Sequence, residues 1–167
     1  MPLKLPPADT YRAPFVEPIG HLAMQAAQAD QTAIALIAAI PFDGSSDQLA
    51  PPYVESRLRY WNASADAFAK GRLSMITDPD LRRQAEESLD RFKRARNARN
   101  RVIHDAVEVG IDLDGSVHSL AVQYAEGEDV WLHKVTPEQI AALAREIYDL
   151  NQDLKIILSL VRNSGQV

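Results

Sequence analysis

The sequence has no cysteine, and this absence removes several kinds of chemistry. Disulfide bonds, thiolate metal sites and cysteine nucleophiles are excluded, and a chain without thiols fits a reducing compartment. Long apolar runs are missing too, because the longest, AIALIAAI at 33–40, is far shorter than the ~20 residues that cross a bilayer. The opening residues, MPLKLPPADTYRAPF, contain no apolar segment like the core of a signal peptide. We therefore expect a cytoplasmic protein with no membrane contact.

Length and composition are those of one globular domain. The 167 residues are 46% apolar and 25% charged, so the chain can bury a core without a metal or a disulfide. Four of the ten prolines fall within residues 1–17, which show no periodicity. We therefore predict a proline-rich arm over 1–17 and a single domain over 18–167.

Apolar periodicity predicts four helices. The first covers 19–40 after Pro18, the second runs from about 53 to 68, and the third begins at Asp78-Pro79 and continues into a basic stretch. Thr136 opens the last helix with a capping box. That helix has the most regular apolar seam in the chain: Ile140, Leu143, Ile147, Leu150, Leu154, Ile157 and Val161. Ile156 and Leu160 fall off the seam and suggest a second contact face.

Between the third and fourth helices the period changes to that of strands. VEVGIDL, VHSLAVQY and VWLHKV are β-branched and roughly alternating, and DG and AEGED separate them. The predicted fold class is therefore mainly α. It is a four-helix up-down bundle with a three-stranded antiparallel β-meander, at about 107–135, inserted before the last helix.

The stretch RFKRARNARNR at 91–101 concentrates positive charge. It holds six of the 18 Lys and Arg residues and no acid, although the chain as a whole carries −5. Without that segment's +6, the remaining residues carry −11. The ordinary interpretation of such a run is a solvated helix face. On a helical wheel, however, the apolar stripe that includes Phe92 continues through Arg96 and Arg99.

Two inward arginines need partners, because a buried unpaired guanidinium destabilises a fold by several kcal/mol. Either acids pair with Arg96 and Arg99, or the bundle opens there onto a wet cleft or another subunit. Asn100 and His104 lie four residues apart on the shoulder of the same stripe, so their side chains are neighbours.

RNRVIH at 99–104 resembles the motif of the HEPN superfamily (higher eukaryotes and prokaryotes nucleotide-binding domains). That motif is an Arg followed four to six residues later by His, with a polar residue directly after the Arg. The place of RNRVIH near the end of a long helix, the helical context and the length of the chain agree with the resemblance. Many toxin members of the superfamily carry an aromatic residue two places after the His, where this chain has Ala106.

The resemblance implies a small helical bundle that forms a homodimer, with the two motifs facing each other across the two-fold axis. Active members are metal-independent endoribonucleases, and others are inactive binding or assembly modules. By this resemblance Arg99 would hold the scissile phosphate, Asn100 would position it or the imidazole, and His104 would be the acid/base. Lys93, Arg96 and Arg101 would then contact the RNA backbone. No metal or cofactor is implied, and a cognate protein partner is left open.

The chemistry agrees with this assignment. Cleavage of RNA without a metal needs a base for the 2′-hydroxyl, an acid for the leaving oxygen and cations on the phosphate. Histidine can serve as either acid or base, and a dimer would supply two. Arg99 and His104 are five residues apart, about 140° around a helix. The two side chains converge only if Arg99 reaches sideways, if the helix unwinds near its end, or if the partner's arginine completes the site. We favour the last two.

Two other functions compete with RNA cleavage. In an inactive HEPN-like dimer, Arg99 and His104 would form a polar network with Asp105 or with acids across the axis. In an HD-type metal phosphohydrolase, the His104-Asp105 pair would share a metal with His21 and with Asp149 or Asp153. Adjacent residues on a helix point 100° apart, which disfavours the metal site.

Overall fold

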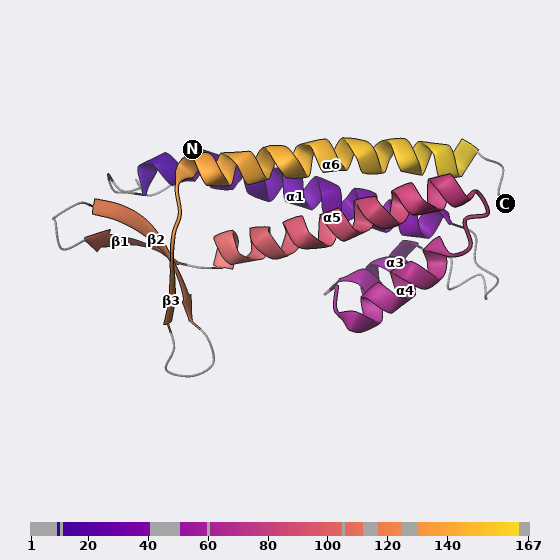
Figure 1. The fold of residues 1–167 in the computed structure, drawn as a ribbon, viewed down its shortest axis with the longest axis horizontal. Helices are drawn as coiled ribbons and strands as arrows, with labels where there is room; N and C mark the ends of the chain where they lie inside the picture. Colours follow the sequence, from indigo (N-terminus) through magenta and orange to yellow (C-terminus); the bar gives the residue numbers. More distant parts are fainter. Residues whose placement is uncertain are drawn as a thin grey trace, which may run out of the picture.

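A computed structural model describes residues 10, 12–40, 51–59, 61–104, 106–111, 117–124 and 130–163. Side chains are described in these ranges except at Pro51, His104, 106–111, 117–124 and 130–134. Three long helices lie side by side: α1 (Ala13–Ala39), α5 (Pro79–His104) and α6 (Pro137–Asn163). Figure 1 shows that α1 and α6 run in one direction and α5 in the other. The short helices α3 (Pro51–Leu58) and α4 (Ala63–Leu73) lie beside the half of the bundle where α5 begins (Figure 1).

The starts of α5 and α6 follow from local capping, as predicted. The Asp78 carboxylate accepts hydrogen bonds from the backbone N–H groups of Asp80 (2.9 Å) and Leu81 (3.1 Å). At the start of α6, the Thr136 hydroxyl accepts from the Gln139 N–H at 3.2 Å, and the Gln139 side chain accepts from the Thr136 N–H at 2.9 Å. Both caps satisfy N–H groups that the first helical turn leaves without partners.

The core lies where α1, α5 and α6 meet. The alanine-rich side of α1 lets α6 approach closely, and the predicted seam of α6 is buried except for the partly buried Leu143. Asn151 is also fully buried on α6, and neither atom of its amide has a partner among the described residues. No helix in the described ranges is long and apolar enough to cross a membrane.

The prediction of four helices is wrong, because the second predicted helix is two. The chain leaves α3 after Leu58, and Trp61 adopts a left-handed backbone conformation with φ 42°. Asn62 then caps α4 by accepting a hydrogen bond from the Ala65 N–H at 3.0 Å. The Trp61 ring packs edge-on against Phe92 of α5, with 5.1 Å between ring centroids. This aromatic contact offsets the strain of a non-glycine residue at positive φ.

The start of α1 also differs from the prediction. The helix begins at Ala13, so residues 13–17, which were assigned to the proline-rich arm, are helical. Pro14 stands in the first turn, where its missing N–H costs no hydrogen bond. Pro18 lies inside the helix and forfeits one backbone bond, to the carbonyl of Pro14. Residues 1–9 of the predicted arm lie outside the described residues.

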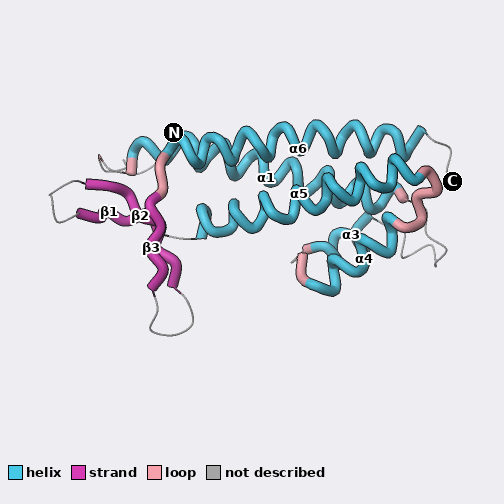
Figure 2. The backbone as a smooth tube through the Cα atoms, in the orientation of Figure 1, coloured by secondary structure: helices cyan, strands magenta, loops and turns pink. Residues whose placement is uncertain are grey.

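The prediction of a fold with a three-stranded β-meander inserted before the last helix is corrected as well. The part of the chain with described side chains contains five helices, is 88% helical and has no strand. Backbone strands are traced only at β1 (Ala106–Ile111), β2 (Val117–Tyr124) and β3 (Val130–Lys134), antiparallel in the order β1-β2-β3. Figure 2 shows these strands beyond the end of the helices, where they do not cover the bundle. A strand pattern predicts pairing between strands but does not predict which surface the sheet covers.

Candidate functional site

The basic stretch 91–101 forms part of the second half of α5 and is largely neutralised by other helices. Four of its six cations are ion-paired with acids on α1, α4 and α6. Arg91, for example, contacts Asp153 of α6 at 3.0 Å. Arg94 and Arg101 are exposed, and neither has an acid partner within the described part of the chain. The stretch is therefore not simply a solvated basic face.

Arg96 and Arg99 share one carboxylate, that of Asp30 on α1. The Arg96 Nε lies 3.2 Å from Asp30 Oδ1, and the Arg99 Nη2 lies 3.0 Å from Asp30 Oδ2. The arginine side chains are only 16% and 17% exposed, which confirms that both face inward. Arg96 also donates to the backbone carbonyl of Arg59 at 3.2 Å. We call Asp30, Arg96 and Arg99 the Asp30 triad.

The Asp30 triad carries an excess positive charge. Two guanidinium groups face a single carboxylate, so the formal sum is +1. The Arg99 Nε is buried and has no hydrogen-bond partner among the described residues. A partly desolvated positive charge attracts anions more strongly than an exposed one, because the effective dielectric constant is lower. The arrangement can therefore hold a phosphate oxygen as a further counter-charge.

Lys93, a predicted RNA contact, links α5 to α4. Its ammonium group forms ion pairs with Asp66 of α4 and with Asp90, and its side chain is 24% exposed. The hydrogen bond from Lys93 lowers the pKa of the Asp66 carboxyl. Burial by itself would lower the pKa of Lys93, but the bonds to Asp66 and Asp90 together raise it. A contact between Lys93 and RNA would have to compete with these two carboxylates.

The structure places only part of the RNRVIH motif. Asn100 is half-buried on α5 directly after Arg99, whereas the side chains of His104 and Asp105 lie outside the described residues. The α5 backbone remains helical through His104. Unwinding before His104, one of the two favoured ways to bring Arg99 and His104 together, is therefore not observed. Completion by a partner's arginine stays a prediction.

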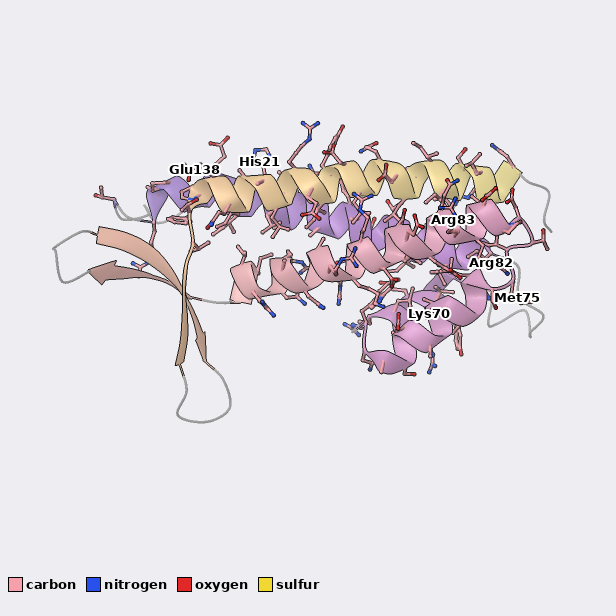
Figure 3. All side chains as sticks on the ribbon, in the orientation of Figure 1. His21, Lys70, Met75, Arg82, Arg83 and Glu138 are labelled. Atoms are coloured by element: carbon pink, nitrogen blue, oxygen red, sulfur yellow. The ribbon has the colours of Figure 1, made fainter. Side chains whose placement is uncertain are left out.

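The residues nominated for an HD-type metal site are engaged elsewhere. His21 lies 3.8 Å from Glu17 and points away from the bundle (Figure 3). Asp149 bonds Arg145 at 3.1 Å, and Asp153 pairs with Arg91. Within the described ranges, no three acidic or histidine side chains gather as a metal-binding group.

Two side chains were not predicted from the sequence: Asp30 of the Asp30 triad and the buried Arg72. Arg72 of α4 is 1% exposed and donates to the carbonyls of Ile37 (3.2 Å) and Ile40 (2.6 Å) at the end of α1. Burial lowers its pKa. Arg72 follows the buried positions 65 and 69 at helical spacing, and this signal could have identified it. Asp30 has no comparable signal, because its partners lie on a distant segment.

Comparisons with known proteins add no relationship. No family model, curated protein or solved structure matches the chain. The resemblance to the HEPN superfamily therefore rests on residues 99–104, on their place near the end of α5 and on the helical context.

Proposed function

We propose that the chain is a HEPN-like RNA-binding protein that cleaves RNA without a metal. Arg99 binds the scissile phosphate, Asn100 positions the phosphate or the imidazole, and His104 transfers the proton. The supporting observation is the excess positive charge of the Asp30 triad, in which Asp30 holds Arg96 and Arg99 partly buried. Prepositioned guanidinium groups lose little freedom when a phosphate binds, and their planar fork matches its oxygens.

The proton transfers require two groups. One group removes the proton of the 2′-hydroxyl, whose oxygen attacks the phosphorus. The other group protonates the 5′-oxygen as its bond to phosphorus breaks, so the products are a 2′,3′-cyclic phosphate and a 5′-hydroxyl. The RNRVIH motif supplies one histidine, so a homodimer with facing motifs would supply both groups. In that arrangement the arginine of one protomer can also approach the histidine of its partner.

Cleavage of labelled mixed RNA in the presence of EDTA tests the proposal. We expect His104→Ala to lower the cleavage rate by roughly a hundredfold or more, because positioned acid/base groups contribute about that much. His21→Ala is the matched control, since His21 is an exposed histidine on α1 that pairs with Glu17 at 3.8 Å. Equal rates for His104→Ala and the wild-type protein would remove the ribonuclease function.

A non-catalytic binding or assembly module is the second candidate. It is favoured by the ion pairs that tie four of the six cations of 91–101 to acids of the same chain. In such a module the Asp30 triad would fix the rotation of α5 against α1. RNA that binds but is not cleaved, with affinity unchanged in His104→Ala, would support this candidate over the enzyme.

A further inference from the structure

A hollow of about 490 Å³ lies between the first halves of α1 and α6, which run side by side (Figure 1). We call it the α1–α6 hollow. Pro18 of α1 and Ala141, Ala144 and Tyr148 of α6 give it apolar walls. Its volume falls within the ~300–1,000 Å³ that is usual for small-molecule sites. It is therefore large enough for an aromatic ring that carries a short chain.

Hydrogen-bond acceptors on α1 stand at two levels of the α1–α6 hollow. Gln25 lines it, and the Gln25 Oε1 atom is buried without a partner among the described residues. Because this oxygen has no hydrogen bond to lose, rotation of the amide about its last side-chain bond can present it to the hollow. Glu17 lines the hollow a little over two helical turns earlier, and its side chain is 86% exposed.

Pro18 adds a further acceptor at the level of Glu17. Proline has no N–H, so the carbonyl of Pro14 receives no helical hydrogen bond from position 18. That carbonyl points along the helix toward Pro18, which lines the α1–α6 hollow. A carboxylate and a carbonyl at one end of the hollow suit a group with several N–H donors and a positive charge, such as an ammonium.

The other charged side chains of the α1–α6 hollow do not cancel the charge of Glu17. The Arg145 Nε bonds both carboxylate oxygens of Asp149 at 3.1 Å, and the Arg145 guanidinium lies over the Tyr148 ring, 5.5 Å from its centroid. His21 lies 3.8 Å from Glu17, but a neutral imidazole supplies no counter-charge. The hollow therefore favours a cationic ligand over an anionic one.

We propose that the α1–α6 hollow binds a small aromatic amine. The ammonium of the ligand donates to the Glu17 carboxylate and to the Pro14 carbonyl, and its ring packs against Pro18 and Tyr148. A hydroxyl or N–H group on the far side of the ring donates to Gln25 Oε1. Glu17 and Gln25 are eight residues apart, about 12 Å along the helix axis. A ring with a two-carbon chain spans that length together with the two side chains.

This site goes beyond the proposed function and does not depend on it. Gln25 and Asp30 lie five residues apart on α1, so their side chains point about 140° apart around the helix. Asp30 faces α5, and the α1–α6 hollow consequently lies on the other side of α1 from the Asp30 triad. Amine binding and RNA cleavage can therefore fail separately.

An NMR titration of the isotope-labelled full chain with tyramine tests the proposal, near about pH 7.5, where an ordinary imidazole is mostly neutral. We expect saturable shifts at backbone amides beside the α1–α6 hollow and a dissociation constant of about 0.1–1 mM, as for other ligands of this size. Phenethylamine, which lacks the ring hydroxyl, should bind about fivefold more weakly. The anion 3-(4-hydroxyphenyl)propionate should bind roughly tenfold more weakly or worse. The absence of saturable shifts with tyramine, or equal binding of the anion, overturns the proposal.

Two variants test the two ends of the α1–α6 hollow separately. Gln25→Met removes the amide but keeps the length of the side chain, so tyramine should lose about fivefold in affinity and its advantage over phenethylamine. Glu17→Gln should weaken both amines by about threefold, because the charge is exposed. Gln28→Met and Glu146→Gln are the matched controls, since neither residue lines the hollow. The spectrum of each variant without ligand shows whether it is folded. Equal losses in folded variants and controls, or unchanged affinity in Gln25→Met and Glu17→Gln, contradict the proposed site.

Discussion

At the scale of the residue, Arg72 shows how one buried cation fastens two helices. The last turn of α1 ends in carbonyls that have no helical N–H partner, and the Arg72 guanidinium donates to those of Ile37, Ala38 and Ile40. A positive charge there also faces the negative end of the α1 dipole. Arg72 thereby closes α4 onto the end of α1, although the two helices lie far apart in sequence.

Replacement of Arg72 by Met should lower the free energy of unfolding by about 2–4 kcal/mol, because buried carbonyls lose their donors. Arg83→Met is the control. Arg83 is 60% exposed and pairs only with acids on its own helix in the described structure, so its loss should change stability by at most about 1 kcal/mol. Urea denaturation gives both values. Similar transition midpoints for the two variants would show that Arg72 does not fasten α4 to α1.

The sequence could place the arginines of the site but not their partner. The stripe from Phe92 predicts that Arg96 and Arg99 face inward, because the side-chain directions along one helix follow from its geometry alone. Asp30 lies 66 and 69 residues from these arginines. Its pairing with them depends on how α1 is rotated and shifted against α5, and helical periodicity does not fix either quantity.

At the scale of the element, helix boundaries that depend on local hydrogen bonds were predicted, and a boundary beside a contact with another helix was missed. The starts of α5 and α6 were predictable because Asp78 and Thr136 bond N–H groups two or three residues away. The break between α3 and α4 was not predicted, since apolar spacing continues across it through Leu58, Trp61 and Ala65. The break coincides with the Asn62 cap of α4 and with the contact of Trp61 with Phe92, a residue of another helix.

The Asp30 carboxylate, which joins α1 to α5, should contribute far more to the free energy of unfolding than an exposed carboxylate in a similar ion pair. Asp30→Asn leaves two partly buried guanidinium groups without a counter-charge, so we expect a loss of about 3 kcal/mol in the free energy of unfolding. Asp153→Asn removes the carboxylate that Arg91 contacts, but both side chains of that pair are more than 40% exposed. We expect a loss below about 1 kcal/mol there.

Chemical denaturation of the two asparagine variants measures the difference. A variant that combines Asp30→Asn with Arg96→Met and Arg99→Met should recover part of the loss, because no unpaired charge remains at that position. Equal stability of Asp30→Asn and Asp153→Asn would mean that the Asp30 triad does not hold α1 against α5.

At the scale of the whole molecule, the acidic chain is arranged around a basic helix. The acids that pair with 91–101 come from three other helices and, at Asp90, from α5 itself, so α5 serves as the electrostatic centre of the bundle. The composition showed the −11 charge of the other segments but not their positions. Likewise, the alternating pattern of 106–134 gave no information on whether a sheet would cover the helices. Both questions concern contacts between distant segments.

This charge arrangement sets how strongly salt should weaken the binding of single-stranded RNA. Affinity falls with salt concentration by a logarithmic slope of about 0.7 for each phosphate neutralised on a single strand. Six free cations would give a slope of about −4. Among the described cations of 91–101, Arg94 and Arg101 have no acid partner in the described residues, and the Asp30 triad has an excess charge of +1. About three positive charges are therefore available to phosphates. We therefore expect a slope of about −2 for each protomer.

Fluorescence anisotropy of a labelled RNA, measured over a series of salt concentrations, gives this slope. Replacement of both Arg94 and Arg101 by Gln should reduce its magnitude by about 1.4, since two phosphate contacts are lost. Lys93→Gln should leave the slope unchanged, because the Lys93 ammonium is committed to Asp66 and Asp90. A slope near −4 in the wild-type protein, or an equal reduction in Lys93→Gln, would show that RNA displaces the ion pairs of α5. In that case the acids of α1, α4 and α6 compete with RNA for the same cations.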